Sequence, residues 1–341
     1  MPFQTVSLAE LAHRFKFDET PLKPVADLYP YRISSYYAGL ITAPHDPIWQ
    51  QCVPSLLELV DTEQHPDPLD EERLSPVPGL IHRYPDRAVL LVSNRCATYC
   101  RFCMRKRRVG CAGGQPALSA ALEYIAATPQ LRDIILSGGD PLMLSDDELH
   151  EILLALRRIP HVEVIRIGSR MPVTAPARIT PAFCRMLAEH HPLYLNTHFN
   201  HPQELTSEAA QACRLLASAG VPLGNQTVLL KGVNDDSPTM QALLTGLLRL
   251  QVRPYYLHQM DLVRGTAHFR TPLEHGRQLI GALRGKISGM AIPHFVIDLP
   301  GGKGKVPVLP DSLTRVGEAV WQVQTSSGET INYFDPVSVA Q

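Results

Sequence analysis

Three of the seven cysteines stand within eight residues, as Cys96, Cys100 and Cys103 in the pattern C-x3-C-x2-C. Thiolates are ligands for zinc and for iron–sulfur clusters. Three thiolates are one fewer than a closed [4Fe–4S] cluster or a structural zinc site requires. A four-iron cube held in this way keeps one iron open to a substrate or cofactor. The pattern therefore predicts a catalytic iron–sulfur cluster.

The remaining cysteines leave other interpretations open. Cys111 could complete a four-thiolate zinc site, or the group of thiols could be accidental. Cys52, Cys184 and Cys213 stand alone and are expected to be small buried residues. An odd number of cysteines, three of them crowded together, is a poor disulfide framework. We therefore expect a reducing compartment, the cytoplasm.

Two glycine-rich segments could approach a ligand closely. Ser137, Gly138, Gly139 and Asp140 follow an apolar run, and the Asp140 carboxylate could accept from an ammonium group. These residues are also typical of a plain turn. The second segment, 298–305, reads DLPGGKGK, but it does not match the P-loop pattern because its last lysine is followed by valine. Taken alone, it is better explained as a flexible surface turn.

The composition is that of a globular protein with no strong preference for nucleic acid or membranes. The 341 residues carry 32 basic and 33 acidic side chains, a formal net charge of -1, and 45% are hydrophobic. Near-neutrality argues against a nucleic-acid partner, and no run approaches the roughly 18 apolar residues of a membrane span. We also expect no secretion signal, because the first residues lack an apolar core. The densest basic run, 105–108 with Arg101, is then expected to serve an internal use.

From residue 87 onward, short apolar runs alternate with helical periodicity. Strands are predicted at 87–93, 133–137, 162–168, 193–199, 221–230, 253–260 and 291–297, and helices at 118–127, 146–158, 181–190, 208–219, 238–250 and 274–285. Ser145 with Glu148 matches a capping box, Thr180 and Ser237 each precede a proline as N-caps, and Gly220 suits a helix C-terminus. Alternating strands and helices predict an α/β fold with a partial or full parallel (β/α) barrel, and an open doubly wound sheet is the alternative.

We expect three regions along the chain. Residues 1–80 should form an N-terminal helical appendage with little chemistry of its own. Residues 81–300 should form the barrel, and residues 301–341 a short closing segment that begins with the lysine-containing loop.

Several segments resemble the lysine 2,3-aminomutase family of radical S-adenosylmethionine (SAM) enzymes. They are RYPDRAVLLVSNRCATYCRFCMRKRR, LSGGDPLMLSD, RIGSRMPV, LNTHFNHPQELT, GVPLGNQTVLLKGVND, RPYYLHQMDL, AHFRTPLEHG and DLPGGKGKVPVLP, spanning about residues 70–310. The resemblance implies a [4Fe–4S] cluster, SAM and pyridoxal phosphate as cofactors. It also implies a radical mechanism that moves the α-amino group of L-lysine to C3 and gives β-lysine.

The resemblance also assigns roles to residues. It implies that the three clustered cysteines hold the iron, that residues 137–140, His198 and Gln226 bind SAM, and that Lys305 forms a Schiff base with pyridoxal phosphate. Arg83, Tyr84 and Arg87 would hold the cofactor phosphate. Arg105 would bind the substrate carboxylate, while Asp261 and Asp298 would receive its distant ammonium. Two neighbouring carboxylates favour a cationic substrate over glutamate.

The sequence departs from better-known relatives in three places. His258 replaces a tyrosine, Lys303 stands where glycine is usual and is a rival to Lys305, and no cysteine follows Cys213, so we expect no zinc between subunits. In its short length, the chain also resembles the branch of the family that makes (R)-β-lysine for the modification of elongation factor P. We expect a homo-oligomer that takes electrons from flavodoxin or ferredoxin.

Three other functions stay open at this point. The same mechanism could act on another cationic amino acid. An iron–sulfur electron carrier or sensor would contain a cluster without SAM cleavage, and a zinc-stabilised interaction module would contain zinc without iron.

Overall fold

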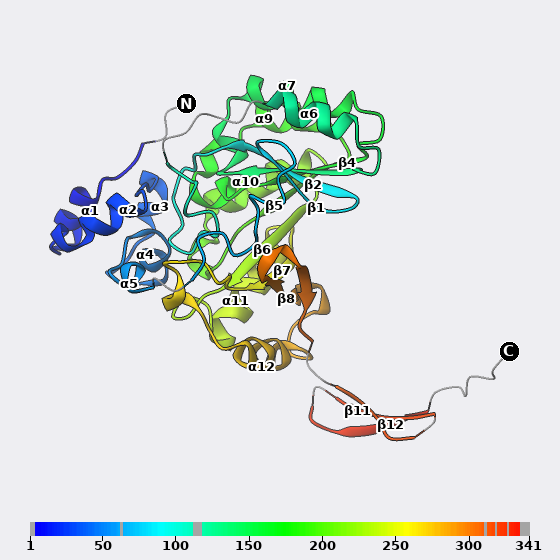
Figure 1. Ribbon diagram of the computed structural model, residues 1–341. Coiled ribbons are helices and arrows are strands. Elements are labelled where there is room, and N and C mark those ends of the chain that lie inside the picture. Colours follow the sequence, from blue (N-terminus) through cyan, green and yellow to red (C-terminus); the bar gives the residue numbers. More distant parts are fainter. Residues whose placement is uncertain are drawn as a thin grey trace.

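The computed structural model describes residues 4–61, 64–111, 118–309, 312–317, 319–325 and 327–334. A nine-stranded sheet with its strands in chain order forms the centre of the molecule (Figure 1). Seven consecutive strands run parallel: β2 (Arg87–Ser93), β3 (Asp133–Gly138), β4 (Val164–Gly168), β5 (Leu193–Thr197), β6 (Leu223–Leu229), β7 (Val252–Gln259) and β8 (His294–Leu299). Strands from both edges line one common cavity, so the sheet curls into a partial barrel. The predicted α/β barrel is confirmed.

Two short antiparallel strands cover the edges of the parallel sheet. β1 (Leu80–Tyr84) pairs with β2, and β9 (Gly304–Pro307) pairs with β8. Neither strand was predicted. The glycine-rich segment therefore ends in a strand, and Lys305 lies within that strand and not in a flexible turn. Backbone hydrogen bonds to β8 fix its position.

Helices connect the parallel strands, as the periodicity predicts. They are α6 (Leu118–Ala126), α7 (Asp146–Arg157), α8 (Met171–Thr174), α9 (Pro181–Ala188), α10 (Ser207–Ser218), α11 (Ser237–Arg249) and α12 (Leu273–Leu283). Single 3-10 turns occur at η1 (Thr20–Leu22), η2 (Pro141–Met143), η3 (Pro176–Arg178), η4 (Pro202–Glu204), η5 (Ala267–Phe269), η6 (Gly289–Ala291) and η7 (Pro300–Gly302).

The predicted helix ends agree with the structure, with one exception. Ser145 and Glu148 form the capping box of α7, and the Thr180 hydroxyl caps α9. Gly220, with φ +76°, follows α10 where a left-handed residue ends a helix. The prediction was wrong for Ser237, which is the first residue of α11. Asp236 is the N-cap there, because its carboxylate accepts from the Thr239 amide at 2.9 Å.

The N-terminal segment packs beside the barrel (Figure 1). Its helices are α1 (Leu8–Phe15), α2 (Lys23–Leu28), α3 (Ser35–Gly39), α4 (Pro47–Cys52) and α5 (Leu57–Val60). Leu11, Ile33 and Tyr37 are fully buried in the same hydrophobic core as Leu90 and Leu136 of the barrel. The expected region limits, 1–80, 81–300 and 301–341, stay a prediction.

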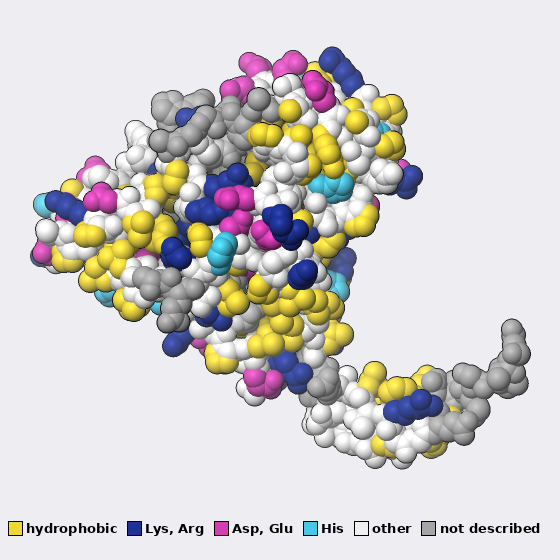
Figure 2. All heavy atoms as spheres, viewed as in Figure 1, with side chains coloured by type: hydrophobic (Ala, Val, Ile, Leu, Met, Phe, Trp, Pro, Cys, Tyr) yellow, Lys and Arg dark blue, Asp and Glu magenta, His cyan; other side chains and the backbone are white. Residues whose placement is uncertain are grey.

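The C-terminal part forms a second, small sheet. β10 (Leu313–Arg315), β11 (Val320–Gln324) and β12 (Thr330–Phe334) pair antiparallel and lie apart from the barrel (Figure 1). Hydrophobic side chains cover part of its surface (Figure 2). The last residues of the expected closing segment, 335–341, lie outside the described residues. Among the described residues, no helix has the length and apolar character needed to cross a bilayer.

Candidate active site

One cavity of about 680 Å³ is lined by residues of the barrel strands and of the loops that follow them. Fourteen of the sixteen residues assigned to the site by resemblance line it. They are Arg83, Tyr84, Arg87, Cys96, Cys100, Arg105, Ser137, Gly139, Asp140, His198, Gln226, Asp261, Asp298 and Lys305. The other two are Cys103 and Gly138. Residues more than 200 positions apart in the sequence therefore meet in one cavity, as a barrel requires.

The three clustered cysteines lie in the loop after β2, and all are free thiols. Cys103 lines a small adjoining cavity together with Cys96 and Cys100. A single tetrahedral zinc ion would draw its ligand sulfurs to within about 3.8 Å of each other, given a Zn–S bond of about 2.3 Å. Among the described residues, the cysteines form no group whose sulfurs all lie within 4.8 Å. The sulfurs are therefore not gathered as closely as one tetrahedral zinc ion would hold them.

Cys111 does not join the other cysteines. Its thiol is exposed, donates to the Arg107 carbonyl at 3.3 Å, and lines neither of these cavities. A four-thiolate zinc site that includes Cys111 has no support in this geometry.

The glycines of the SGGD turn allow close contact with the cysteine loop. Gly138 has φ +123°, and a Cβ atom there would lie 2.2 Å from the Ser93 carbonyl oxygen. A Cβ at Gly139 would lie 2.4 Å from the Arg95 carbonyl oxygen. The Gly139 amide donates to the Ser93 carbonyl at 2.6 Å. The glycines therefore dock the turn against the start of the cysteine loop, a role that the sequence interpretation did not include.

The carboxylate of Asp140 is already bonded within the protein. It accepts from the Leu142 amide at 3.0 Å, the Ser169 hydroxyl at 2.7 Å and the Arg170 amide at 2.8 Å. Burial raises its pKa, against the effect of these hydrogen bonds. Asp140 thus links the turn to the end of β4, in addition to lining the cavity.

Cationic and phenolic groups gather at the β1–β9 side of the cavity. The Tyr84 hydroxyl accepts from Arg83 Nη2 at 3.1 Å and from the Lys305 amide at 3.0 Å. The guanidinium of Arg87 lies over the Tyr84 ring at 3.9 Å from its centroid. Two guanidinium groups beside one phenol fit a dianionic phosphate. Lys303 is exposed and does not line the cavity, whereas Lys305 does.

Two acids lie beside these cations. Asp298 accepts from Arg83 Nη1 at 2.8 Å and from Lys305 Nζ, and these partners hold its pKa below the usual value despite burial. Burial, followed by repulsion from Asp298, raises the pKa of Asp261 to about 7. Burial and Lys305 lower the pKa of His258 to about 3, so its imidazole is neutral.

Arg105 is oriented by an acid that the sequence interpretation missed. Its Nε and Nη2 donate to Glu71 at 3.0 and 2.7 Å, and its Nη1 donates to the Ser137 hydroxyl at 2.9 Å. A guanidinium has five N–H groups, so two of them, one on each terminal nitrogen, remain for a carboxylate in the cavity. Glu71 lies in the N-terminal segment, far from the motif in sequence.

Most of the basic run around the cysteines pairs with acids inside the protein. Fully buried Glu58 accepts from Arg101 Nη2 and from Lys106 Nζ, both at 2.6 Å. Arg107 pairs with Asp67 at 2.9 Å. All these acids come from the first 80 residues, so this segment holds the cysteine loop in place. Their spacing in the sequence carries no periodic signal that could have revealed this.

The two remaining residues with an expected role in SAM binding also line the cavity, one after β5 and one within β6. His198 follows β5, is half-buried, and its Nε2 bonds to the Asn200 side-chain oxygen at 3.1 Å. Burial lowers its pKa well below the usual value, so the imidazole is neutral. Gln226 lies in β6, at an irregularity in its pairing with β7.

Comparisons with known proteins agree with this geometry. Residues 90–243 match the Radical SAM superfamily, and residues 280–336 match the family described as Lysine-2,3-aminomutase. L-lysine 2,3-aminomutase of Fusobacterium nucleatum is 54% identical over 310 residues, covering 89% of this chain and 73% of that protein. The chain belongs to the lysine 2,3-aminomutase family.

Other family members mark the range of similarity. L-lysine 2,3-aminomutase of Clostridium subterminale is 48% identical over 90% of this chain and 75% of its own length. A relative named glutamate 2,3-aminomutase, from Clostridioides difficile, is 41% identical over 98% of this chain and 80% of its own length. The chain is thus an aminomutase-type isomerase of the radical SAM superfamily.

Proposed function

We propose that this aminomutase moves the α-amino group of L-lysine to C3 and produces β-lysine, with a [4Fe–4S] cluster, SAM and pyridoxal phosphate. One observation carries the proposal: Cys96, Cys100 and Lys305 line one cavity together with the acids Asp261 and Asp298. The cysteines would hold the cluster, Lys305 would bond the cofactor and the two acids would bind a cationic substrate, all in this cavity.

The residues present fit the cluster and SAM. Cys96, Cys100 and Cys103 supply three sulfurs, which are not all within 4.8 Å of one another. Ser137, Gly139, Asp140, His198 and Gln226 line the same cavity and, with Gly138 of the same turn, would contact SAM at the remaining iron.

The residues also fit pyridoxal phosphate. Arg83, Tyr84 and Arg87 would hold the phosphate, and Lys305 would bond the aldehyde. Lys305 is favoured over Lys303 because only Lys305 of the two lines the cavity. When bound, the cluster and SAM supply a hydrogen-abstracting radical, and pyridoxal phosphate supplies the aldehyde that carries the migrating amino group.

The chain's own residues position the substrate. The two N–H groups that Arg105 directs toward the cavity would bind the α-carboxylate as a fork. Asp261 and Asp298 would receive the distant ammonium, which would take over the contact that Lys305 now makes with Asp298. Holding both ends of an extended diamine fixes C3 in one place, which is the main task of a protein that hosts a radical.

These acids favour lysine over glutamate. A glutamate side chain would bring a third negative charge beside Asp261 and Asp298, in a buried site where like charges repel strongly. Other cationic amino acids, including arginine and ornithine, would pair with the acids but differ in length.

The experiment is turnover by anaerobically reconstituted protein with SAM, pyridoxal phosphate, dithionite and L-lysine. β-Lysine should form, and L-glutamate should give at most trace product under the same conditions. Chiral analysis of the product assigns the (R) or the (S) branch. Preference for glutamate, arginine or ornithine would overturn the substrate assignment, and no product from any amino acid would overturn the function.

We also propose a flavodoxin- or ferredoxin-type electron donor, a cytoplasmic location and a homo-oligomer. Exposed Leu313, Ile331, Tyr333 and Phe334 on the small sheet β10–β12 support the last point, because apolar groups at such a surface favour burial in a subunit contact (Figure 2). Sedimentation of the purified protein tests this, and a monomer would contradict it.

A further inference from the structure

A buried guanidinium stands directly behind one of the proposed cluster ligands. Arg170 follows β4, is 8% exposed, and donates from Nη1 to the Cys100 sulfur at 2.8 Å. Its Nε donates to the His198 carbonyl at 3.1 Å, which fixes the plane of the guanidinium. A charged donor is thus aimed at a sulfur that would be bonded to iron.

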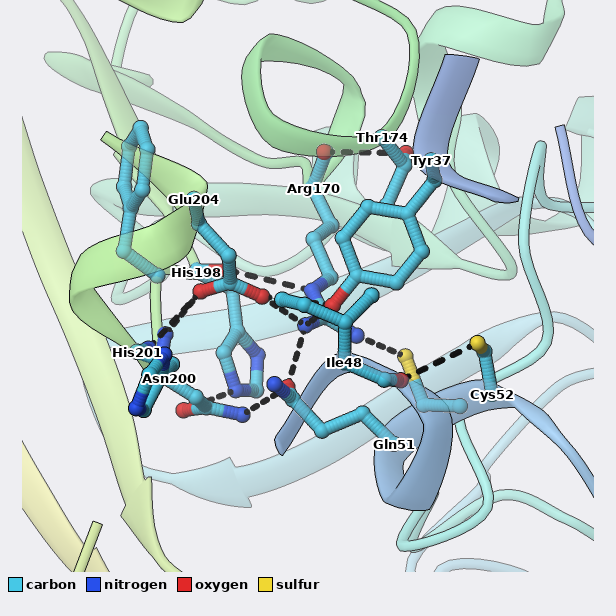
Figure 3. A network of polar contacts seen from close by, with 12 residues as sticks. Tyr37, Ile48, Gln51, Cys52, Arg170, Thr174, His198, Asn200, His201 and Glu204 are labelled. Carbon is cyan, nitrogen blue, oxygen red and sulfur yellow. Dashed lines mark hydrogen bonds and ion pairs between the residues drawn. The ribbon is translucent and has the colours of Figure 1, made fainter. Parts of the chain in front are cut away.

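The opposite edge of Arg170 is held by a polar network (Figure 3). Nη2 lies within hydrogen-bond distance of three oxygens that share its two N–H groups: Glu204 at 2.7 Å, the Gln51 side-chain oxygen at 2.5 Å and the Tyr37 hydroxyl at 3.0 Å. Glu204 is fully buried, and its first carboxylate oxygen also accepts from the Tyr37 hydroxyl at 2.6 Å. Two of these partners, Tyr37 and Gln51, belong to the N-terminal segment.

The network keeps the guanidinium charged and immobile. Arg170 lies near the rings of Tyr37 and Phe102, with its central carbon 5.2 and 5.3 Å from their centroids. Its contacts reach four separate parts of the chain, so its position does not depend on the cysteine alone. A buried cation is costly unless an acid compensates its charge, and Glu204 provides that acid.

A hydrogen-bond donor and a positive charge next to a cluster ligand change the reduction potential of the cluster. Reduction adds one negative charge to the cluster, and hydrogen bonds to its sulfurs stabilise the more negative state. Low polarity around the site strengthens this effect. Removing the donor should therefore lower the reduction potential, and removing the acid that offsets its charge should raise it.

We propose that Arg170, held by Glu204, is a positioning residue that raises the reduction potential of the iron–sulfur cluster through its hydrogen bond to Cys100. An external one-electron reductant gives one electron to the cluster, and Arg170 transfers neither an electron nor a proton. The inference rests on the proposed cysteine ligation and extends it beyond the three ligands.

The test is a redox titration of the reconstituted protein without SAM, followed by electron paramagnetic resonance of the reduced cluster. Arg170→Gln should decrease the ratio of reduced to oxidised cluster about tenfold at a fixed ambient potential, which is about 59 mV for one electron. Arg170→Lys keeps the charge and should restore part of the shift. Glu204→Gln should shift the potential in the opposite direction, which a purely structural role would not do.

Arg178→Gln is the matched control. Arg178 also pairs with an acid, Asp146 at 2.6 Å, and lies over the Phe183 ring, but it does not line the cavity. Its removal should leave the potential unchanged. Equal shifts in Arg178→Gln and Arg170→Gln would overturn the inference.

The remaining outcomes separate this inference from the proposed ligation. Wild-type potentials in iron-loaded Arg170→Gln and Glu204→Gln overturn the role of Arg170 alone. If Arg170→Gln fails to hold a cluster, the reduction potentials of Arg170→Lys and Glu204→Gln test the role of Arg170 instead. Wild-type potentials in both variants would again overturn that role. Undiminished iron binding in Cys100→Ala would instead overturn the ligation itself.

Discussion

Asp298 and Lys305 face each other as direct partners in the antiparallel pair β8–β9, and the Lys305 ammonium bonds to the Asp298 carboxylate. The residue proposed to bond the cofactor therefore occupies the acid proposed for the substrate's distant ammonium. If Lys305 bonds pyridoxal phosphate as proposed, its ammonium would leave Asp298, which would keep its contact with Arg83 and could accept the substrate's distant ammonium.

Replacing Lys305 tests which lysine bonds the cofactor. In Lys305→Ala, borohydride should no longer attach pyridoxal phosphate to the protein, and turnover should fall by about a hundredfold or more. Lys303→Ala is the matched control and should keep both properties, because Lys303 lies outside the cavity lining. Mass spectrometry of the borohydride-treated protein reads the result. Cofactor attached at position 303 in the wild-type chain would contradict the assignment.

Replacing cysteines tests the cluster ligands. Cys103→Ala should lose most of the iron and the visible absorbance of the reconstituted protein, because two thiolates hold a cube poorly. Cys111→Ala should retain both, since its thiol lies away from the other three. Iron and zinc analysis measures this. One zinc per chain, lost in Cys111→Ala, would favour the zinc module.

The raised pKa of Asp261 predicts a pH dependence of lysine binding. Burial and Asp298 raise this pKa to about 7, so the group is neutral below that pH and negative above it. Only the negative form attracts an ammonium, so the KM for lysine should rise roughly tenfold from pH 8 to pH 6 as the charged fraction falls. In Asp261→Asn this dependence should largely disappear. A flat wild-type KM over this range would contradict the role of Asp261.

Replacing Glu58, which lies outside every motif, is expected to lower the free energy of unfolding strongly. It is fully buried between Arg101 and Lys106, and Glu58→Gln would leave two buried cations without their acid. We expect a loss of about 3–5 kcal/mol in the free energy of unfolding. Glu72→Gln is the control, because Glu72 is exposed in its contact with Arg107 and should change stability by less than about 1 kcal/mol. Denaturant titration compares the two, and equal losses would contradict this account.

Most of the barrel could be predicted from the sequence, because parallel strands buried on both faces are continuous apolar runs and their helices repeat every 3.6 residues. Strands β1 and β9 were missed because they are short and partly polar. The gathering of Arg83, Asp261 and Lys305 followed from the family resemblance, and only Asp261 was placed at the end of a predicted strand.

The partners of the site residues could not be predicted. Glu71 beside Arg105, Glu58 beside Arg101 and Glu204 beside Arg170 are contacts across long stretches of sequence, and an isolated glutamate carries no local pattern. Arg170 itself follows a predicted strand, so its position at a strand end was a usable signal. What it touches depends on how the N-terminal segment packs, which only the folded structure shows.

The cluster with SAM and a lysine substrate that takes the place of Lys305 on pyridoxal phosphate are proposed to share one cavity. Turnover of lysine carrying deuterium at C3 tests this most directly, with mass spectrometry of the 5′-deoxyadenosine and the β-lysine formed. The account predicts deuterium in both products, because the hydrogen leaves C3, passes to the adenosyl carbon and returns to the amino acid. β-Lysine formed with no deuterium ever detected in 5′-deoxyadenosine would contradict it.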